Sequence, residues 1–264
     1  MRKFSSIRSA YPITVSELAS FIPSAFAVNA WEKMSNKYSF LSTAEVIHAL
    51  QGEGYGCFSA KQSGTRIGGK EGYTKHCLRF RKINSGFNQP LVGDILPEIQ
   101  VINSHCGSAY IVEAGLYRLA CGNGLTVSVG SLSLTRVVHK NESIETVLDA
   151  VKNVVNQFPL VADTIRKMQE RVLTYSERSK FAELALLLRY DMGKEPYEAN
   201  RLLVPRRALD VGSSLWAVYN VIQENITQST QRRGRFEHSS RAVRSIDTDL
   251  TINRDLWALT QAYA

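Results

Sequence analysis

Hydrophobic and polar residues alternate over much of the chain between about residues 54 and 138. The clearest case is the segment 73–83. There His76, Leu78 and Phe80 alternate with Cys77, Arg79 and Arg81. Neighbouring side chains of a strand point to opposite faces of its sheet. The pattern therefore predicts a strand with one apolar face and one cationic face, and we expect Arg79 and Arg81 to be exposed.

A second strand pattern, Phe58 to Gln62, precedes this one, and the loop Arg66 to Gly72 between them holds three glycines. Glycine readily adopts the positive φ values that a hairpin loop requires. Further strands are expected over residues 98–103, 109–120, 125–129 and 134–139. Nothing long enough to be a crossover helix lies between them, so a meandering, mostly antiparallel sheet is the simplest topology.

After residue 140 the hydrophobic spacing changes to three and four residues, which predicts helices. The first is marked by Ile144, Val147, Leu148, Val151, Val154, Val155 and Phe158. Ser42 to Glu45 and Thr174 to Glu177 match the capping box that opens a helix. A further helix is expected over Ser213 to Ile226, and a short terminal one around Leu256, Trp257 and Leu259.

These elements predict an α+β fold, with a mostly antiparallel sheet over about 54–139 followed by a helical C-terminal half. We expect three regions within one compact domain. Residues 1–53 form an N-terminal arm and a short helix, and the arm orders against a neighbouring subunit. Residues 54–140 form the sheet with a basic hairpin, and residues 141–264 form a helical region with an arginine-rich loop.

Charge changes the picture, because the chain carries a formal net charge of +8. Between Lys61 and Lys82, seven basic residues stand against the single acid Glu71. A second cluster lies in the polar stretch 227–245, with Arg232, Arg233, Arg235, Arg241 and Arg244 against Glu237. A solvated charged face would also explain such runs. Their clustering favours a polyanionic partner.

Motifs of catalysis are absent from the sequence. There is no phosphate loop ending in GKS or GKT, no HExxH and no GxSxG. Cysteine pairs with zinc spacing are also missing, so we expect no metal, no cofactor and no enzyme activity. Two alternatives stay open: Cys121 could be a nucleophile with His105 or His139 as its base, and Asp94, Glu98 and Glu113 could serve an unfamiliar nuclease.

Blocks within about residues 90–260 resemble the phage- and plasmid-type family classed as domain of unknown function 932. They are 103–105 (NSH), 109–110 (AY), 115–119 (GLYRL), 121–125 (CGNGL), Arg136, His139, 220–225 (NVIQEN) and 253–257 (NRDLW). The family pattern places an acidic residue after the Ser-His pair, where this chain has Cys106. The resemblance implies DNA recombination or evasion of host defence as the setting, and it implies no particular reaction.

We therefore expect a non-enzymatic protein that binds nucleic acid, preferring single-stranded DNA, in recombination or annealing. Phosphates would be contacted by basic side chains of the hairpin and the late loop, and bases would stack on Tyr73 or Phe87. The expected contact residues are Lys61, Arg66, Lys70, Tyr73, Lys75, Arg79, Arg81, Lys82, Arg232, Arg233, Arg235 and Arg241.

The alternative function is that of a protein-binding inhibitor of a host defence or nuclease complex, whose basic loops would meet an acidic surface. Homo-oligomers are expected under the first reading, by likeness to phage single-strand annealing proteins that form rings. A cytoplasmic location is expected for both. No export signal follows Met1, and the longest apolar run, Leu184 to Leu188, is far too short to span a membrane.

Overall fold

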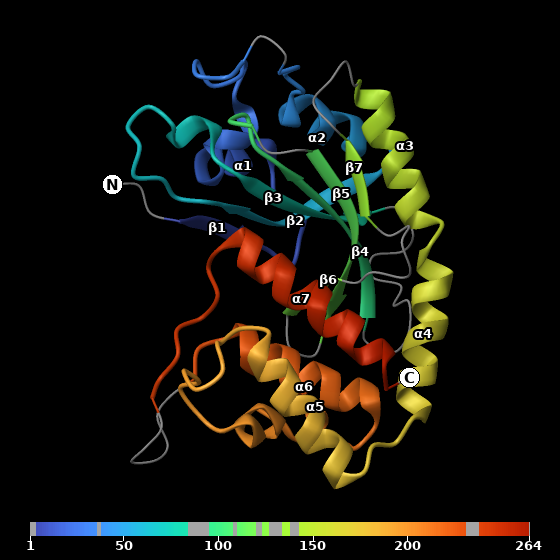
Figure 1. Ribbon diagram of the computed structural model, residues 1–264. Helices are drawn as coiled ribbons and strands as arrows, with labels where there is room; N and C mark the ends of the chain where they lie inside the picture. Colours follow the sequence, from blue (N-terminus) through green and yellow to red (C-terminus); the bar gives the residue numbers. More distant parts are fainter. Residues whose placement is uncertain are drawn as a thin grey trace. The chain divides into compact units, whose positions relative to one another are not determined.

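Figure 1 shows a computed structural model of the chain, which describes residues 4–35, 38–83, 95–107, 110–119, 123–126, 134–137, 143–230 and 238–263. The chain divides into two compact units, Met1–Pro159 and Leu160–Ala264. This division replaces the expected single domain with boundaries near residues 53 and 140, because α3 (Ile144–Val155) contacts the sheet and therefore belongs to the first unit.

The N-terminal unit is built on a seven-stranded antiparallel sheet. Its strands follow one another in space in the order of the sequence from β1 to β6, and β7 also pairs with β5. The strands are β1 (Ser5–Arg8), β2 (Tyr55–Gln62), β3 (His76–Lys82), β4 (Ile95–Asn103), β5 (Tyr110–Arg118), β6 (Asn123–Thr126) and β7 (Leu134–Val137). The predicted α+β class and the antiparallel meander are confirmed.

The segment expected to be an arm is instead part of this unit over residues 4–35. Strand β1 pairs with β2, with Ser5 opposite Gln62. Helix α1 (Val15–Phe21) opens with a full capping box at Thr14, and the 3-10 turn η1 (Pro23–Phe26) follows it. Leu18 and Ile22 are fully buried. The arm prediction is wrong because these apolar side chains find their partners within the same chain.

One face of the sheet is apolar, as the alternation predicts. Leu78 and Phe80 of β3 are buried there, beside Val101 and Ile99 of β4, their register partners. Helix α2 (Thr43–Gly52) contacts β2 and α3, and the Ser42 side chain accepts a hydrogen bond from the Glu45 amide at its start. The helix places buried Val46, Ile47 and Leu50 in the core.

The C-terminal unit is helical, and its helices form their own apolar core. They are α4 (Phe158–Glu170), α5 (Tyr175–Leu187), α6 (Leu215–Thr227) and α7 (Ile246–Gln261), with the short turns η4 (Ala199–Leu203) and η5 (Ala208–Asp210). Tyr219 of α6 stacks on Trp216 and meets the edge of Trp257 from α7. Helix α7 is longer than the short terminal helix expected.

Within the described ranges, we find no helix that combines the length and the apolar character needed to cross a membrane.

Candidate nucleic-acid interface

Arg79 and Arg81 do not form the expected exposed cationic surface. They share one face of the sheet, as predicted, but their residues are only 6% and 7% exposed. Arg79 Nη1 lies 3.1 Å and Arg81 Nε 2.8 Å from the carboxylate of Glu98 on β4, which is fully buried. The period-two pattern correctly placed Arg79 and Arg81 on the same face of β3. It could not show that this face is buried. Both arginines are therefore removed from the set that could contact phosphates.

The Arg81 guanidinium is further enclosed by two aromatic rings. Its Cζ lies 4.5 Å from the ring centre of Phe58 and 3.8 Å from that of Tyr117. Glu98, one of the three carboxylates considered for a nuclease, is thus engaged by two arginines, and Asp94 lies outside the described residues. This arrangement joins β3 to β4, and the two arginines occupy both carboxylate oxygens of Glu98 that would otherwise bind a metal ion.

A cationic and aromatic surface lies instead at the connection between β2 and β3. Trp31 is half-buried, and two ammonium groups converge on its ring, Lys33 Nζ at 5.5 Å and Lys70 Nζ at 4.8 Å from the centre. Tyr73 lies half-buried nearby, and its hydroxyl donates to Asn29 Oδ1 at 3.2 Å. We call Trp31, Lys33, Lys70 and Tyr73 the Trp31 cluster.

His105 connects the two aromatic residues of this cluster through its backbone. The Trp31 amide donates to the His105 carbonyl at 2.9 Å, and the His105 amide donates to the Tyr73 carbonyl at 3.1 Å. The loop is also held by Gln62, whose Nε2 donates to the Glu71 carbonyl at 2.9 Å. The Trp31 cluster therefore has a defined shape, fixed by three separate segments of the chain.

A buried polar network around His76 lies next to these anchors. The ring of His76 is hydrogen-bonded to Ser24 Oγ at 3.0 Å and to Thr43 Oγ1 at 2.9 Å, and Asn103 Nδ2 donates to the same Thr43 oxygen. Burial, and next the proximity of His105, lowers the pKa of His76 to about 3. His76 is therefore neutral at physiological pH, and the network has a structural role.

The remaining hairpin residues differ in their surroundings. Arg66 is exposed near the tip of the loop, where Gly69 adopts a φ of 76°. Lys61 and Lys75 are half-buried. Lys82 is exposed at the end of β3, where its Nζ donates to the Glu53 carbonyl at 2.8 Å and lies 4.6 Å from the Tyr55 ring centre. Only part of the predicted set is thus gathered at the loop.

The predicted late-loop residues are placed only in part. Arg241 is exposed, and its carbonyl accepts a hydrogen bond from Arg189. Six other candidates lie outside the described residues. They are the late-loop arginines Arg232, Arg233 and Arg235, the stacking candidate Phe87, and Cys121 and His139, which were considered for catalysis. Among the residues the structure describes, no group of three or more His, Cys, Asp or Glu is arranged to hold a metal ion.

Trp31 and Lys33 were missed by sequence reasoning. They belong to a stretch without helical or strand periodicity, and a hydrogen bond to His105, far along the chain, brings them to the loop. The available signal was local and weak, since a tryptophan with a lysine two residues later is also common at ordinary surfaces.

Comparison with known proteins gives relatives over almost the whole chain. Two UPF0380 proteins of Escherichia coli strain K12, YafZ and YfjQ, are 34% and 33% identical to it over 261 and 260 residues. Each match covers 97% of this chain and 93% of the relative. No solved structure matches the chain.

A family model also matches residues 30–257. This range includes every block on which the resemblance was based, as well as Trp31, Lys33 and the whole β2–β3 loop. The resemblance inferred from the sequence is confirmed, while a link to phages and plasmids stays a prediction. The chain belongs to the family described as domain of unknown function DUF932.

Proposed function

We propose that this protein binds single-stranded nucleic acid without catalysing a reaction, through the Trp31 cluster and the neighbouring Arg66, and that it serves recombination or annealing. The observation that carries the proposal is the meeting of two lysines at one partly exposed indole. Arg79 and Arg81 take no part, because they are buried against Glu98.

The charges of this surface favour a polyanion. Lys33, Lys70 and Arg66 form no ion pair among the residues that the structure describes. Both ammonium groups lie close to the Trp31 ring centre, at 5.5 and 4.8 Å, so a phosphate bound beside this ring could be contacted by both. Two acids, Glu32 and Glu71, are neighbours of these lysines in the sequence, and neither forms an ion pair with them. The three basic side chains therefore stay available to a nucleic-acid backbone.

The aromatic residues favour a single strand. An unpaired base offers a flat face to an aromatic side chain, and such stacking contributes about 1–3 kcal/mol per base. Trp31 and Tyr73 are both half-buried, their backbones are joined through His105, and the Tyr73 hydroxyl is bonded to Asn29, so the segments that carry the rings are already ordered before binding. Base pairs within a duplex offer no comparable free face.

The test compares the double variant K33A/K70A with the wild-type protein, in fluorescence anisotropy with a labelled single-stranded oligonucleotide across a salt series. Two phosphate contacts are removed, so the slope of log K against log salt should become shallower by about 1.4, at about 0.7 per contact for single strands. The matched control is K152A/K180A, which removes two exposed lysines that are each paired with an acid on the same helix.

Several results would contradict the proposal. One is a slope that both double variants change equally, since only the total charge would then matter. Another is the absence of binding by the folded wild-type protein at low salt. The variant Trp31→Ala should weaken binding by about 10-fold or more through lost stacking, while Trp31→Phe should retain most of the affinity.

A further inference from the structure

The N-terminal unit contains a pocket beside the ends of α2 and α3, and none of the described residues that line it belongs to the Trp31 cluster. Its volume is about 170 Å³. An apolar cavity of about 150 Å³ is large enough to hold benzene. The pocket therefore suits an organic group of about the size of one aromatic ring.

The inner part of the pocket is apolar. Leu148, Val151 and Val155 follow one another at spacings of three and four residues on α3, so they share one face of that helix. Leu50 of α2 and Val151 are both buried. Tyr55, at the start of β2, adds an aromatic side chain. These residues offer a surface against which an apolar side chain could be buried.

A positive charge is held at this pocket in a defined position. Lys82, at the end of β3, donates from Nζ to the Glu53 carbonyl at 2.8 Å, and the same atom lies 4.6 Å from the ring centre of Tyr55. An ammonium group has three donors, so two remain after this bond. Lys82 forms no ion pair among the residues that the structure describes. It can therefore receive a carboxylate.

A negative charge lies close by. Glu53 caps the C-terminal end of α2, and its carboxylate forms no ion pair within the described part of the chain. Burial, and next the charge of Glu53, raises the pKa of Tyr55, so this carboxylate lies near the aromatic side chain that Lys82 also approaches. The C-terminal end of a helix adds the equivalent of about −0.5 charge. Glu53 and the end of α2 together favour an ammonium group.

Lys152 also lines the pocket, but its charge is compensated. Its Nζ lies 3.2 Å from Asp149 Oδ1 on the same helix. Of the charged residues described at the pocket, Lys82 and Glu53 are thus left without an ionic partner, and their side chains do not pair with each other. A simple anion or cation would be attracted by one and repelled by the other. A zwitterion can pair with both.

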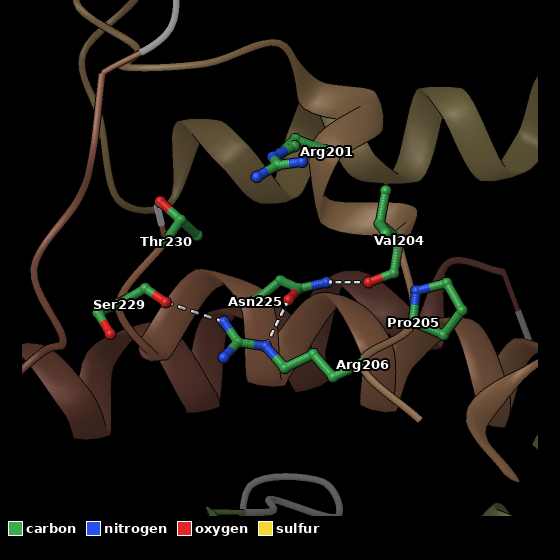
Figure 2. A pocket seen from close by; sticks show the side chains of 7 residues that line it. All are labelled: Arg201, Val204, Pro205, Arg206, Asn225, Ser229 and Thr230. Carbon is green, nitrogen blue, oxygen red and sulfur yellow. Dashed lines mark hydrogen bonds between the residues drawn. The ribbon is translucent and has the colours of Figure 1, made fainter. Parts of the chain in front are cut away.

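The larger pocket of the C-terminal unit, about 490 Å³ in volume, has polar groups that bond to one another (Figure 2). Arg206 Nε lies 2.8 Å from Asn225 Oδ1, and its Nη2 lies 3.1 Å from the Ser229 carbonyl oxygen. Asn225 Nδ2 donates to the Val204 carbonyl at 2.8 Å. These bonds join α6 and the residues after it to the segment that follows η4, so they stabilise the fold. The two unpaired charges of the smaller pocket stay available to a ligand.

We propose that the pocket beside α2 and α3 binds a free α-amino acid whose side chain is apolar and of the size of leucine or phenylalanine. The side chain packs against Leu50, Val151 and Val155. The carboxylate pairs with Lys82, and the ammonium group pairs with Glu53. The inference is independent of the function proposed for the Trp31 cluster, because it depends on other residues.

Calorimetric titration of the full chain with L-leucine, L-phenylalanine and three analogues tests the proposal. We expect both amino acids to bind. Leucinamide lacks the carboxylate and N-acetyl-leucine lacks the ammonium group, so each should bind about 5-fold more weakly than leucine, which is the upper end for one exposed ion pair. Alanine should bind more than about 10-fold more weakly, because it has little apolar surface to bury.

Two variants connect each charge of the ligand to its residue. Lys82→Gln should lower the affinity for leucine by about 5-fold and should leave leucine and leucinamide binding alike. Glu53→Gln should have the same effect on leucine and should remove its advantage over N-acetyl-leucine. The matched control is Lys180→Gln, which removes an exposed lysine of α5 that is paired with Glu183. It should bind leucine as the wild type does.

Val155→Phe fills part of the pocket and should abolish the binding of leucine in a protein whose circular dichroism is unchanged. The proposal is overturned if the folded wild-type protein binds neither amino acid, or if leucinamide and N-acetyl-leucine both bind as tightly as leucine. It is also overturned if Lys82→Gln and Lys180→Gln behave alike, or if folded Val155→Phe keeps full affinity.

The two proposals can fail separately, because the Trp31 cluster and the described lining of this pocket share no residue. K33A/K70A should bind leucine normally. Lys82→Gln should bind the labelled single-stranded oligonucleotide as the wild type does.

Discussion

The basic residues of this protein differ in their roles, depending on whether an acidic side chain lies beside them. Arg79 and Arg81 are buried and share the carboxylate of Glu98, and Arg207 is held by Glu224 and Asp210. The charged groups of these residues are fully engaged within the fold. Lys33, Lys70 and Lys82 form no ion pair among the described residues, and these are the residues we expect to meet a ligand. Pairing, more than the number of positive charges, is therefore our basis for separating structural basic residues from those expected to bind.

The buried pairing predicts a large effect of Glu98→Ala. Removing the carboxylate takes an ion-pair partner away from two buried guanidinium groups, which should lower the free energy of unfolding by about 3–5 kcal/mol. Urea denaturation followed by circular dichroism would measure this change. Glu183→Ala, which removes the exposed partner of Lys180, should stay within about 0.5 kcal/mol of the wild type.

A second variant separates charge from packing at this place. Combining Glu98→Leu with Arg79→Met and Arg81→Met removes all three charges and keeps apolar volume, which often restores stability lost by breaking a buried pair. It should be more stable than Glu98→Ala. If Glu98→Ala proves as stable as the wild type, the two arginines are not held by this carboxylate in solution.

At the scale of elements, local sequence rules predicted most starts and ends. Thr174 accepts a hydrogen bond from the Glu177 amide, and the Glu177 side chain accepts from the Thr174 amide, as a capping box requires. The Thr174 bonds, together with Arg171, lower the pKa of Glu177 to about 2. Helix α5 therefore begins where the sequence indicated, through interactions that span only a few residues.

Thr174→Ala should destabilise the C-terminal unit by about 1 kcal/mol, because the first amides of α5 lose their side-chain acceptor. The comparison is Thr164→Ala on α4, where the hydroxyl donates to the Leu160 carbonyl one turn earlier. Alanine is the better helix former at such an interior position, so this change should be neutral or stabilising. Thermal unfolding of both variants gives the difference, and equal melting temperatures would argue against a contribution from the cap.

Elements that depend on distant partners could not be predicted in this way. Strand β1 has only four residues, too few for alternation to stand out, and it exists because β2 offers a free edge. The face of β3 that carries Arg79 was correctly assigned from period-two alternation, whereas its burial depends on what covers the sheet. The sequence therefore predicts the strands and helices better than it predicts which of their faces meet solvent.

At the scale of the whole molecule, the candidate site depends on contacts between segments far apart in the sequence. Trp31, Tyr73 and His105 come from three regions and meet through two backbone hydrogen bonds. Composition and charge clustering pointed to the β2–β3 loop, and Arg66, Lys70 and Tyr73 lie there. No local pattern could show that Trp31 and Lys33 join them, since only folding brings these residues together.

Acid should weaken the N-terminal unit through His76, which is neutral when folded. Its pKa is about 3 in the folded protein against 6.5 for the free side chain. Between these values the unfolded chain binds a proton that the folded chain does not. The contribution of His76 is therefore fully present above pH 6.5 and is lost as the pH falls towards 3, at up to about 1.4 kcal/mol per pH unit.

Urea denaturation at pH 7, 6, 5 and 4 would measure this dependence. His76→Gln should lower stability at pH 7 and give a shallower fall in acid. Acid also changes the charge of every other titratable group, so the comparison is with His48→Gln, which alters an exposed histidine of α2. That variant should follow the wild-type curve, and a His76→Gln curve parallel to the wild type would contradict the assignment.

The pairing of β1 with β2 also has a consequence for synthesis on the ribosome. Ser5 pairs with Gln62, so β1 emerges well before its partner. At about 5–20 residues per second, several seconds separate the two strands. During that time the backbone groups and apolar side chains of residues 4–35 have no sheet to join. The nascent segment behaves as an arm until β2 appears, and only then becomes the edge of the sheet.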